Sequence, residues 1–273
     1  MHPPPEQASD WSAPWWDDHG SFLANLDGSN LPATQQLNQW LPPGTISGGG
    51  KLLRFVPASR VPDVEYERHI FETGEVSTRA GSRHDLFNAL VWCVLPRLKA
   101  AMNALHYAHL EEARDGRRGA QRDALTLLDE SGAIVVSSNR SLLAALARRD
   151  WRQAFRAQAG AWQHDVRTVI CGHGLLQKLR APYKSITAQV LLLYQDAAAA
   201  ASWSGDFLSG LDAAVGQRLL GGLCQSPADL SPLPLMGIPG WWPEGDQDES
   251  FYDDAAVFRS APRAFRPAPI HIL

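Results

Sequence analysis

The longest regular pattern in the chain covers residues 83–110, RHDLFNALVWCVLPRLKAAMNALHYAHL. Apolar residues recur there every three to four positions, which places them on one face of a helix. The polar residues at the edge of that apolar face are His84, Asn88, Lys99 and His106, with Asn103 just beyond it. The pattern predicts a long helix. We expect a kink or a restart at Pro96, because proline removes a backbone donor and clashes with the preceding turn.

Shorter patterns predict the other elements. Residues 123–139 predict a β-hairpin, with strands at Leu125–Leu128 and Ala133–Val136 and a turn at Glu130-Ser131-Gly132; Asp129-Glu130, after the first strand, is expected to be part of the polar turn. The apolar, β-branched run at Ser185–Tyr194 predicts a core strand, with a helix as the alternative. The remaining helical patterns lie at residues 140–180 and 204–223.

These elements predict an α+β fold, a mainly helical single domain around the long kinked helix with a small antiparallel β element. We expect three parts: a Trp/Pro-rich N-terminal segment at residues 1–45, a main domain at 46–225, and an extended Pro-rich tail at 226–273. Large aromatic side chains are rarely left in solvent. The tryptophans in the two end segments include Trp11, Trp15, Trp16, Trp241 and Trp242. We therefore expect both end segments to dock on the main domain.

Composition narrows the class of protein. A formal charge of −4 and a pI near 6.1 argue against a nucleic-acid or anionic-membrane partner. No apolar run approaches the roughly 20 residues that span a bilayer, and the first residues lack the basic and apolar regions of a secretory signal. Three well-separated cysteines, Cys93, Cys171 and Cys224, predict reduced, buried thiols. We expect a cytoplasmic protein with no nucleic-acid and no membrane partner, and the oligomeric state stays open.

The two ends of the long helix carry most of the candidate chemistry. Its first turn offers His84, Asp85 and Asn88, with Arg79 close in sequence. A structural interpretation is that Asp85 stabilises the helix N-terminus and His84 lies at the surface. Asn88 and His106 are eighteen residues apart, roughly 27 Å along a continuous helix. They can therefore share one small-molecule site only if Pro96 breaks the helix sharply.

His173 is the second candidate, in the sequence Cys171-Gly172-His173-Gly174. Flanking glycines allow a ligand or another backbone to approach closely. The residue is therefore either a metal ligand or general base, or part of a helix-packing contact. A carboxylate such as Glu67 or Asp123 could complete a site with it. The sequence contains no phosphate-binding loop, no dinucleotide-binding glycine pattern and no nucleophile elbow.

Two His-Asp doublets, His84-Asp85 and His164-Asp165, superficially match the metal set of HD-type phosphohydrolases, with His69 as the upstream histidine and Asp123 or Asp129 as the downstream aspartate. Imidazole and carboxylate together suit divalent transition metals. The fifteen-residue gap after His69 is short for that family, and we expect a hairpin to follow. The match is weak.

A larger set of motifs resembles a proteobacterial family of proteins of unknown function, from about residue 40 onward. The motifs are the run from Tyr66-Glu67 to Arg79, HDLFNALVW at 84–92, PRLK at 96–99, Asn103, His106, RDALT at 122–126 with Asp129-Glu130, Gly172-His173, PLMGIPGW at 234–241, and FYDD at 251–254 with Phe258-Arg259. The resemblance implies a glutamate where this chain has Gln177, so a carboxylate at that position is missing here. It implies no activity.

Two hypotheses follow. In the first, the chain is a metal-assisted hydrolase of a small-molecule substrate, with His84, Asp85, Asn88 and His173 as its catalytic residues. In the second, it is a non-catalytic binding or scaffold protein whose buried polar residues are structural. The sequence leaves open whether the chain is an enzyme, and it identifies neither a metal nor a cofactor.

Overall fold

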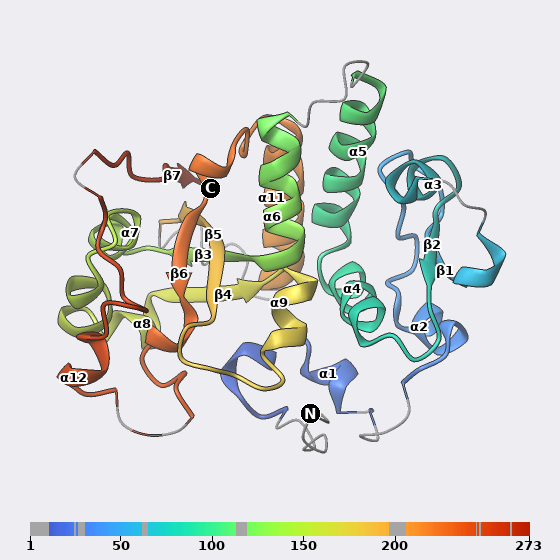
Figure 1. The fold of residues 1–273 in the computed structure, drawn as a ribbon. Helices are drawn as coiled ribbons and strands as arrows, with labels where there is room; N and C mark the ends of the chain where they lie inside the picture. The colour runs from blue at the N-terminus through green and yellow to red at the C-terminus, as the bar shows by residue number, and fades with distance from the viewer. Residues whose placement is uncertain are drawn as a thin grey trace.

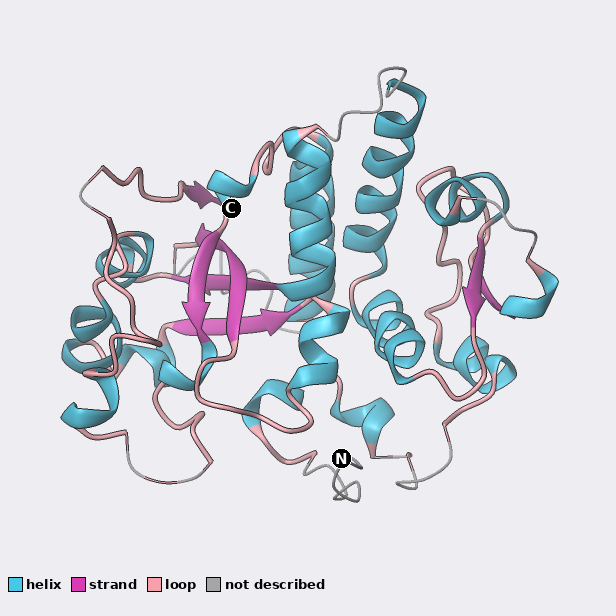
Figure 2. Cartoon of the chain, viewed as in Figure 1, coloured by secondary structure: helices cyan, strands magenta, loops and turns pink. Residues whose placement is uncertain are grey.

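The computed structural model describes residues 11–273 except 25, 27–30, 62–64, 113–118, 197–205, 244, 246 and 263. A five-stranded mixed sheet lies on one side of the molecule, and a smaller parallel pair of strands lies on the other (Figures 1 and 2). Helices separate the two sheets. Within the described residues no helix is long and apolar enough to cross a membrane.

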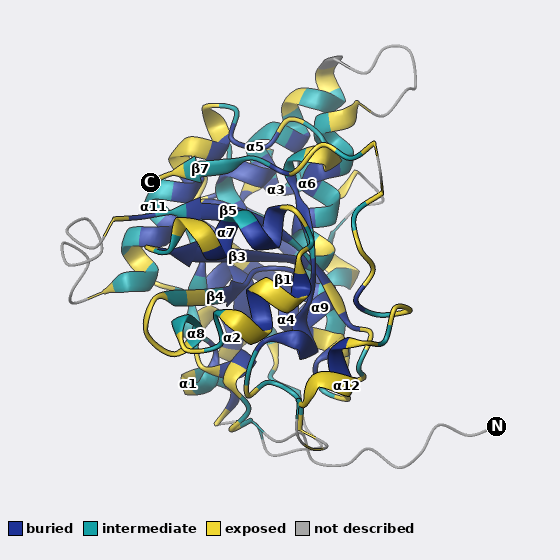
Figure 3. Cartoon of the chain, turned by 90° about the vertical axis from the view of Figure 1, so that its left-hand side faces the viewer, coloured by how far each residue is buried: buried dark blue, intermediate teal, exposed yellow. Residues whose placement is uncertain are grey.

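The large sheet is built around two parallel strands. Its members are β3 (Gly132–Ser137), β4 (Val166–Ile170), β5 (Thr187–Tyr194), β6 (Ser231–Pro234) and β7 (Ile270–Ile272). β3 pairs with β5 in parallel and with β4 antiparallel, while β5 also pairs antiparallel with β6 and parallel with β7. β3 is buried along its whole length (Figure 3), as expected for a strand covered on both faces. The predicted core strand at 185–194 is β5, which begins two residues later.

The helices around the large sheet and between the two sheets are α4 (Arg83–Val94), α5 (Pro96–Glu112), α6 (Ala120–Ser131), α7 (Arg140–Ala147), α8 (Ala161–His164), α9 (His173–Lys178), α11 (Phe207–Leu220) and α12 (Glu249–Tyr252), with a π-helical turn at Arg152–Ala157. The smaller unit contains α2 (Thr34–Trp40), β1 (Arg54–Pro57), α3 (Tyr66–Thr73) and β2 (Glu75–Thr78). Short 3-10 turns lie at Pro14–Trp16, Ala58–Arg60, Pro227–Asp229 and Leu235–Gly237, and α1 covers Gly20–Leu23. The predicted start of α11 at 204 lies outside the described residues.

The helix predicted over 83–110 is two helices that meet at Leu95. Leu95 leaves the helical conformation, with φ −128° and ψ 58°, and α5 restarts at Pro96. Proline suits the first turn of a helix, where its missing N–H costs no hydrogen bond. The buried Asp212 of α11 caps the new helix, accepting from the backbone N–H of Arg97 at 3.0 Å and of Leu98 at 2.8 Å.

The hairpin predicted at 123–139 is wrong in its first half. Residues Leu125–Leu128 belong to α6, and only the strand from Gly132 onward exists. The buried positions Ala124, Leu125 and Leu128 have helical spacing, and β3 pairs with β4 and β5 instead of a sequence neighbour. The expected small antiparallel element is therefore a larger mixed sheet. A side chain at Gly132 would collide with the carbonyl of Leu128, so glycine permits the abrupt change from helix to strand.

Both end segments contact the rest of the protein where they are described. Trp15 and Trp16 are buried, and the Trp15 ring lies 5.9 Å from that of Trp241. Residues 226–273 contribute β6 and β7 to the large sheet. The prediction of free, buried cysteines is confirmed for Cys93, Cys171 and Cys224.

Candidate functional site

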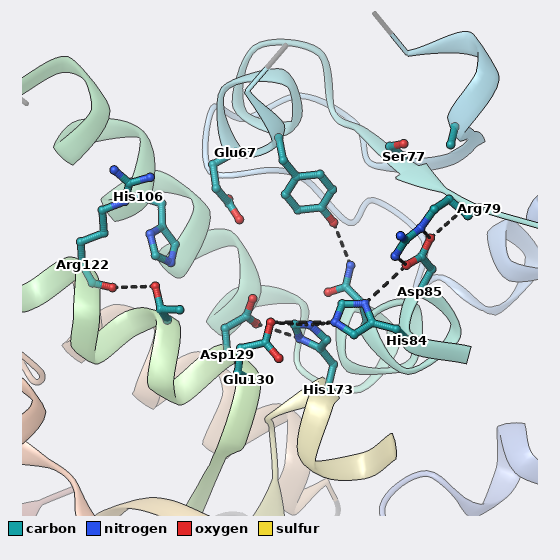
Figure 4. Close-up of a pocket in the computed structure, with 14 residues that line it drawn as sticks. Glu67, Ser77, Arg79, His84, Asp85, His106, Arg122, Asp129, Glu130 and His173 are labelled. Carbon is teal, nitrogen blue, oxygen red and sulfur yellow. Dashed lines mark hydrogen bonds and ion pairs between the residues drawn. The ribbon is translucent and has the colours of Figure 1, made fainter. Parts of the chain in front are cut away.

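A pocket of about 400 Å³ lies where α3, α4, α5, α6 and α9 come together (Figure 4). Its lining residues are Ala58, Tyr66, Glu67, Ser77, Arg79, His84, Asp85, Asn88, His106, Arg122, Thr126, Asp129, Glu130 and His173. All four predicted site residues, His84, Asp85, Asn88 and His173, are among them. The break at Leu95 also brings His106 to the same pocket as Asn88, which a continuous helix would not allow.

Two histidines and a glutamate converge on one point of this pocket. The Nε2 atoms of His84 and His173 are 3.1 Å apart. Glu130 Oε1 lies 3.4 Å from Nε2 of His173 and 3.9 Å from Nε2 of His84. Zinc–nitrogen bonds of about 2.05 Å in a tetrahedral site would space two ligand atoms by roughly 3.3 Å. The three donor atoms are therefore arranged as the ligands of one small cation would be.

Glycines bring His173 to Glu130. A side chain at Gly172 would collide with the backbone of Gly132, and a Cβ at Gly174 would lie 2.6 Å from Glu130 Oε2 and 3.0 Å from its carbonyl oxygen. The start of α9 can approach the end of α6 because both positions lack side chains. The helix-packing interpretation and the site interpretation of His173 are therefore compatible. The glycines allow α9 to pack on α6, and this packing places the imidazole in the pocket.

A partly buried ion pair lies behind His173. Asp129 Oδ1 is 3.7 Å from His173 Nδ1 and accepts a hydrogen bond from Lys99 Nζ at 2.6 Å. Burial opposes ionisation of Asp129, but Lys99, itself only 5% exposed, holds the pKa of this carboxyl well below its usual range. Burial likewise disfavours the charged form of His173, but Asp129 and Glu130 outweigh it and raise the pKa of His173 to about 9.

A second carboxylate lies behind His84. Asp85 Oδ1 is 3.4 Å from His84 Nδ1. Arg79 binds both oxygens of Asp85, donating from its side chain at 2.7 and 3.0 Å and from its backbone N–H at 2.7 Å. Burial opposes the charge, but these bonds lower the pKa of Asp85 to about 2. Asp85 therefore faces the outer nitrogen of His84 and is held by Arg79, while the backbone N–H of Asp85 donates to the helix cap Ser82.

Asn88 and Glu67 form the opposite wall. Asn88 Nδ2 donates to the hydroxyl of Tyr66 at 2.8 Å, and its buried Oδ1 has no hydrogen-bond partner among the described residues. Asn103 Nδ2 donates to Glu67 Oε2 at 2.8 Å and to the Glu67 carbonyl at 2.9 Å. Burial raises the pKa of the Glu67 carboxyl. Of the two carboxylates considered from the sequence, Glu67 lines the pocket and Asp123 does not.

Other expectations are corrected. His69 lies 3.1 Å from Glu75, outside the pocket, and His164 is exposed on α8, so the HD-type metal set does not assemble. Gln177 is exposed and lies outside the pocket. Burial raises the pKa of the Cys171 thiol, which makes it a poor nucleophile.

The sequence interpretation named Asp129 for the HD-type metal set and Asp129-Glu130 among the family motifs, but it assigned both residues to a polar turn and chose neither as a site residue. Both lie in the last turn of α6 and line the pocket. One signal was present: Arg122, Thr126 and Glu130 are four residues apart, the spacing of one helix face. The expectation of a hairpin concealed it.

Comparison with known proteins places the chain in a family. A family described as a protein of unknown function, DUF3025, matches residues 53–262. The chain belongs to this family. The expected membership of a family of unknown function is thereby confirmed, and the family match contains His84, Glu130 and His173. No curated protein and no solved structure matches the chain.

Proposed function

We propose that this protein is a metal-dependent hydrolase of a small molecule, in which His84, His173 and Glu130 bind a divalent transition metal such as zinc. The observation that carries the proposal is the 3.1 Å separation of the two imidazole Nε2 atoms beside a carboxylate oxygen. Two histidines and one glutamate are a ligand set of catalytic zinc sites, in which the fourth position is left for water or substrate.

The surroundings of the two histidines support this proposal. Each imidazole presents Nε2 to the shared point and has a carboxylate near Nδ1, Asp85 for His84 and Asp129 for His173. Metal-binding histidines commonly interact through the second nitrogen with such a carboxylate, which orients the ring. Arg79 and Lys99 in turn hold the two carboxylates ionised and in place.

The cluster is also accessible to a substrate. The side chains of His84 and Glu130 are 41% and 50% exposed, while His173 is buried. A metal held between them has its open side toward the pocket, where a bound water would reach a pKa near 7. Glu67, a carboxyl of raised pKa in the same pocket, is suited to proton transfer, and the amide of Asn88 to substrate binding.

The size of the pocket, about 400 Å³, supports a small-molecule substrate. Three free, buried cysteines support a cytoplasmic location. The scaffold hypothesis accounts for some of the polar residues on α5. Lys99 pairs with Asp129, and Asn103 joins α5 to Glu67 and to the backbone of Gly48. A hydrogen bond between the two imidazole Nε2 atoms also accounts for their contact without a metal. Glu130 Oε1 as a third donor atom, and the exposure of His84 and Glu130, favour the metal site. In this proposal Lys99, Asn103 and Asp129 have structural roles and the histidine cluster is the site.

Metal content tests the proposal. Protein purified without a histidine tag and without chelator is equilibrated with Zn²⁺, desalted and analysed by inductively coupled plasma mass spectrometry. We expect one zinc per chain in the wild type and in the control His164→Ala, which changes an exposed histidine outside the pocket. His84→Ala and His173→Ala should each lose the metal while keeping a folded circular dichroism spectrum. A wild-type protein that takes up no zinc, manganese or iron contradicts the proposal.

A hydrolase screen on the same samples tests the catalytic part of the proposal. Ester, amide and phosphoester substrates are offered to metal-loaded wild type, to the EDTA-treated protein and to Glu67→Gln. We expect turnover that EDTA abolishes and that Glu67→Gln lowers by about 10²-fold or more, as for loss of a general acid or base. Metal binding without turnover of any substrate class would leave a metal-binding protein and refute the hydrolase.

A further inference from the structure

His106 is a largely buried side chain that faces the pocket and forms no hydrogen bond with the part of the protein that the structure describes. The residue is only 7% exposed and lines the pocket (Figure 4). Its ring nitrogens form no hydrogen bond with a residue that the structure describes, and they keep some exposure, which the pocket beside them supplies. A ligand in the pocket can therefore act as their hydrogen-bond partner.

Arg122 lies beside His106 on the α6 side of the pocket (Figure 4). Its one hydrogen bond to a described side chain runs to Glu65 at 3.3 Å, and that carboxylate is 45% exposed. Such exposed pairs contribute at most about 1 kcal/mol. Most of the five guanidinium donors are therefore available to a ligand, and their planar fork matches a carboxylate or a phosphate.

The helix spacing places this pair away from the histidine cluster. Arg122, Thr126 and Glu130 occupy successive turns of one face of α6, so the first and last are about 12 Å apart along the axis. Arg122 and His106 thus line one end of the pocket, and Glu130 lines the other end. A single extended small molecule can contact both ends.

We infer that His106 and Arg122 form a subsite for an anionic group of the substrate, a carboxylate or a phosphate, while the bond to be hydrolysed lies at the histidine cluster. The second half of this inference rests on the proposed function. The subsite itself rests on the unpartnered imidazole and the weakly paired guanidinium. Burial lowers the pKa of His106 to about 4, so its neutral ring offers one N–H donor to the anion without adding charge.

A chain-length series of dicarboxylates tests the subsite. Succinate, glutarate, adipate, pimelate and suberate are titrated calorimetrically into the zinc-equilibrated protein, each beside its monoamide, which lacks the second charge. We expect one chain length at which the dicarboxylate binds at least about tenfold more tightly than its monoamide, the effect of one charged hydrogen-bonded contact. A phosphonate in place of the second carboxylate, at that length, distinguishes the two anions by which one binds more tightly.

The variants Arg122→Gln and His106→Phe should reduce the preference for the dicarboxylate to less than about threefold and leave zinc stoichiometry unchanged. The control Arg152→Gln removes an exposed ion pair, with Asp253, outside the pocket and should keep the full preference. Equal binding of every dicarboxylate and its monoamide, or a preference that survives Arg122→Gln, overturns the subsite.

Zinc stoichiometry separates this result from the fate of the proposed function. If the wild type takes up no zinc, the metal proposal fails. A preference for dicarboxylates that Arg122→Gln removes then still supports the subsite, and the absence of that preference overturns both.

Discussion

The Nε2 atoms of His84 and His173 lie 3.1 Å apart although 89 positions separate the two residues in the chain. Each histidine lies in the first turn of its helix, His84 in α4 and His173 in α9, and the two rings meet edge to face at 89°. Because neither ring is rotated away, both nitrogens point at the same small volume, with Glu130 Oε1 as the third atom around it. This relationship makes metal binding the first property to measure.

Metal removal should lower thermal stability. A ligand present at 100 times its dissociation constant stabilises the folded state by about 2.7 kcal/mol. For a chain of this length that corresponds to a fall in Tm of roughly 5–10 °C when EDTA removes the metal. Differential scanning fluorimetry with zinc and with EDTA measures it. The shift should vanish in His173→Ala and persist in His164→Ala; identical wild-type melts under both conditions would contradict a bound metal.

Replacing Gly174 should damage the cluster without unfolding the protein. In Gly174→Ala the new Cβ would lie 2.6 Å from Glu130 Oε2, so the carboxylate must move away from the histidines. We expect zinc affinity to fall by at least about tenfold, the usual scale for disturbing the groups around a metal. A competition titration with a chromophoric chelator measures the affinity. Gly160→Ala, where nothing lies within 4 Å of the new atom, is the matched control and should bind zinc normally.

Removing only one partner of the Lys99–Asp129 ion pair should lower the free energy of unfolding. Lys99→Met leaves the partly buried Asp129 charge, 16% exposed, without its partner, and we expect a loss of up to about 3–5 kcal/mol, the range for breaking a buried pair. The double variant Lys99→Met/Asp129→Asn removes both charges and should recover part of this loss. Urea unfolding, followed by tryptophan fluorescence, measures the free energies. A Lys99→Met protein within 1 kcal/mol of wild type, on the same scale, would show that the pair carries little energy.

His19 should make the protein sensitive to mild acid. The residue is fully buried, neither ring nitrogen has a hydrogen-bond partner among the described residues, and burial lowers its pKa to about 4. The unfolded chain takes up this proton near pH 6.5 and the folded chain near pH 4. Above pH 6.5 His19 is neutral in both states and does not lower the free energy of unfolding. As the pH falls from 6.5 to 4, this group lowers the free energy of unfolding by roughly 3 kcal/mol.

Urea unfolding across this pH range checks the prediction for His19. The variant His19→Leu should lose this part of the pH dependence, whereas the exposed control His164→Leu should retain the wild-type curve. An unchanged pH dependence in His19→Leu would mean that other groups cause the acid sensitivity.

Local patterns in the sequence determined several parts of this protein. The apolar periodicity of 83–110 predicted helix, Pro96 predicted its interruption, and the apolar run at 185–194 predicted a core strand. The polar residues His84 and Asn88 and the glycines around His173 were visible as candidate chemistry. Such features depend on which side of one element faces the core and on backbone stereochemistry, both of which the local sequence records.

Tertiary structure alone decided how the candidates combine. The angle between α4 and α5 at Leu95 brings Asn88 and His106 to one pocket, and the packing of α9 on α6 brings His173 to Glu130. Residues 120–131 form a helix because β3 finds its partners in β4 and β5, far away in the chain, and needs no adjacent strand. A periodic pattern specifies that a face is buried but not which distant residues bury it. The proposed set of metal ligands therefore became visible only when the long-range contacts were in place.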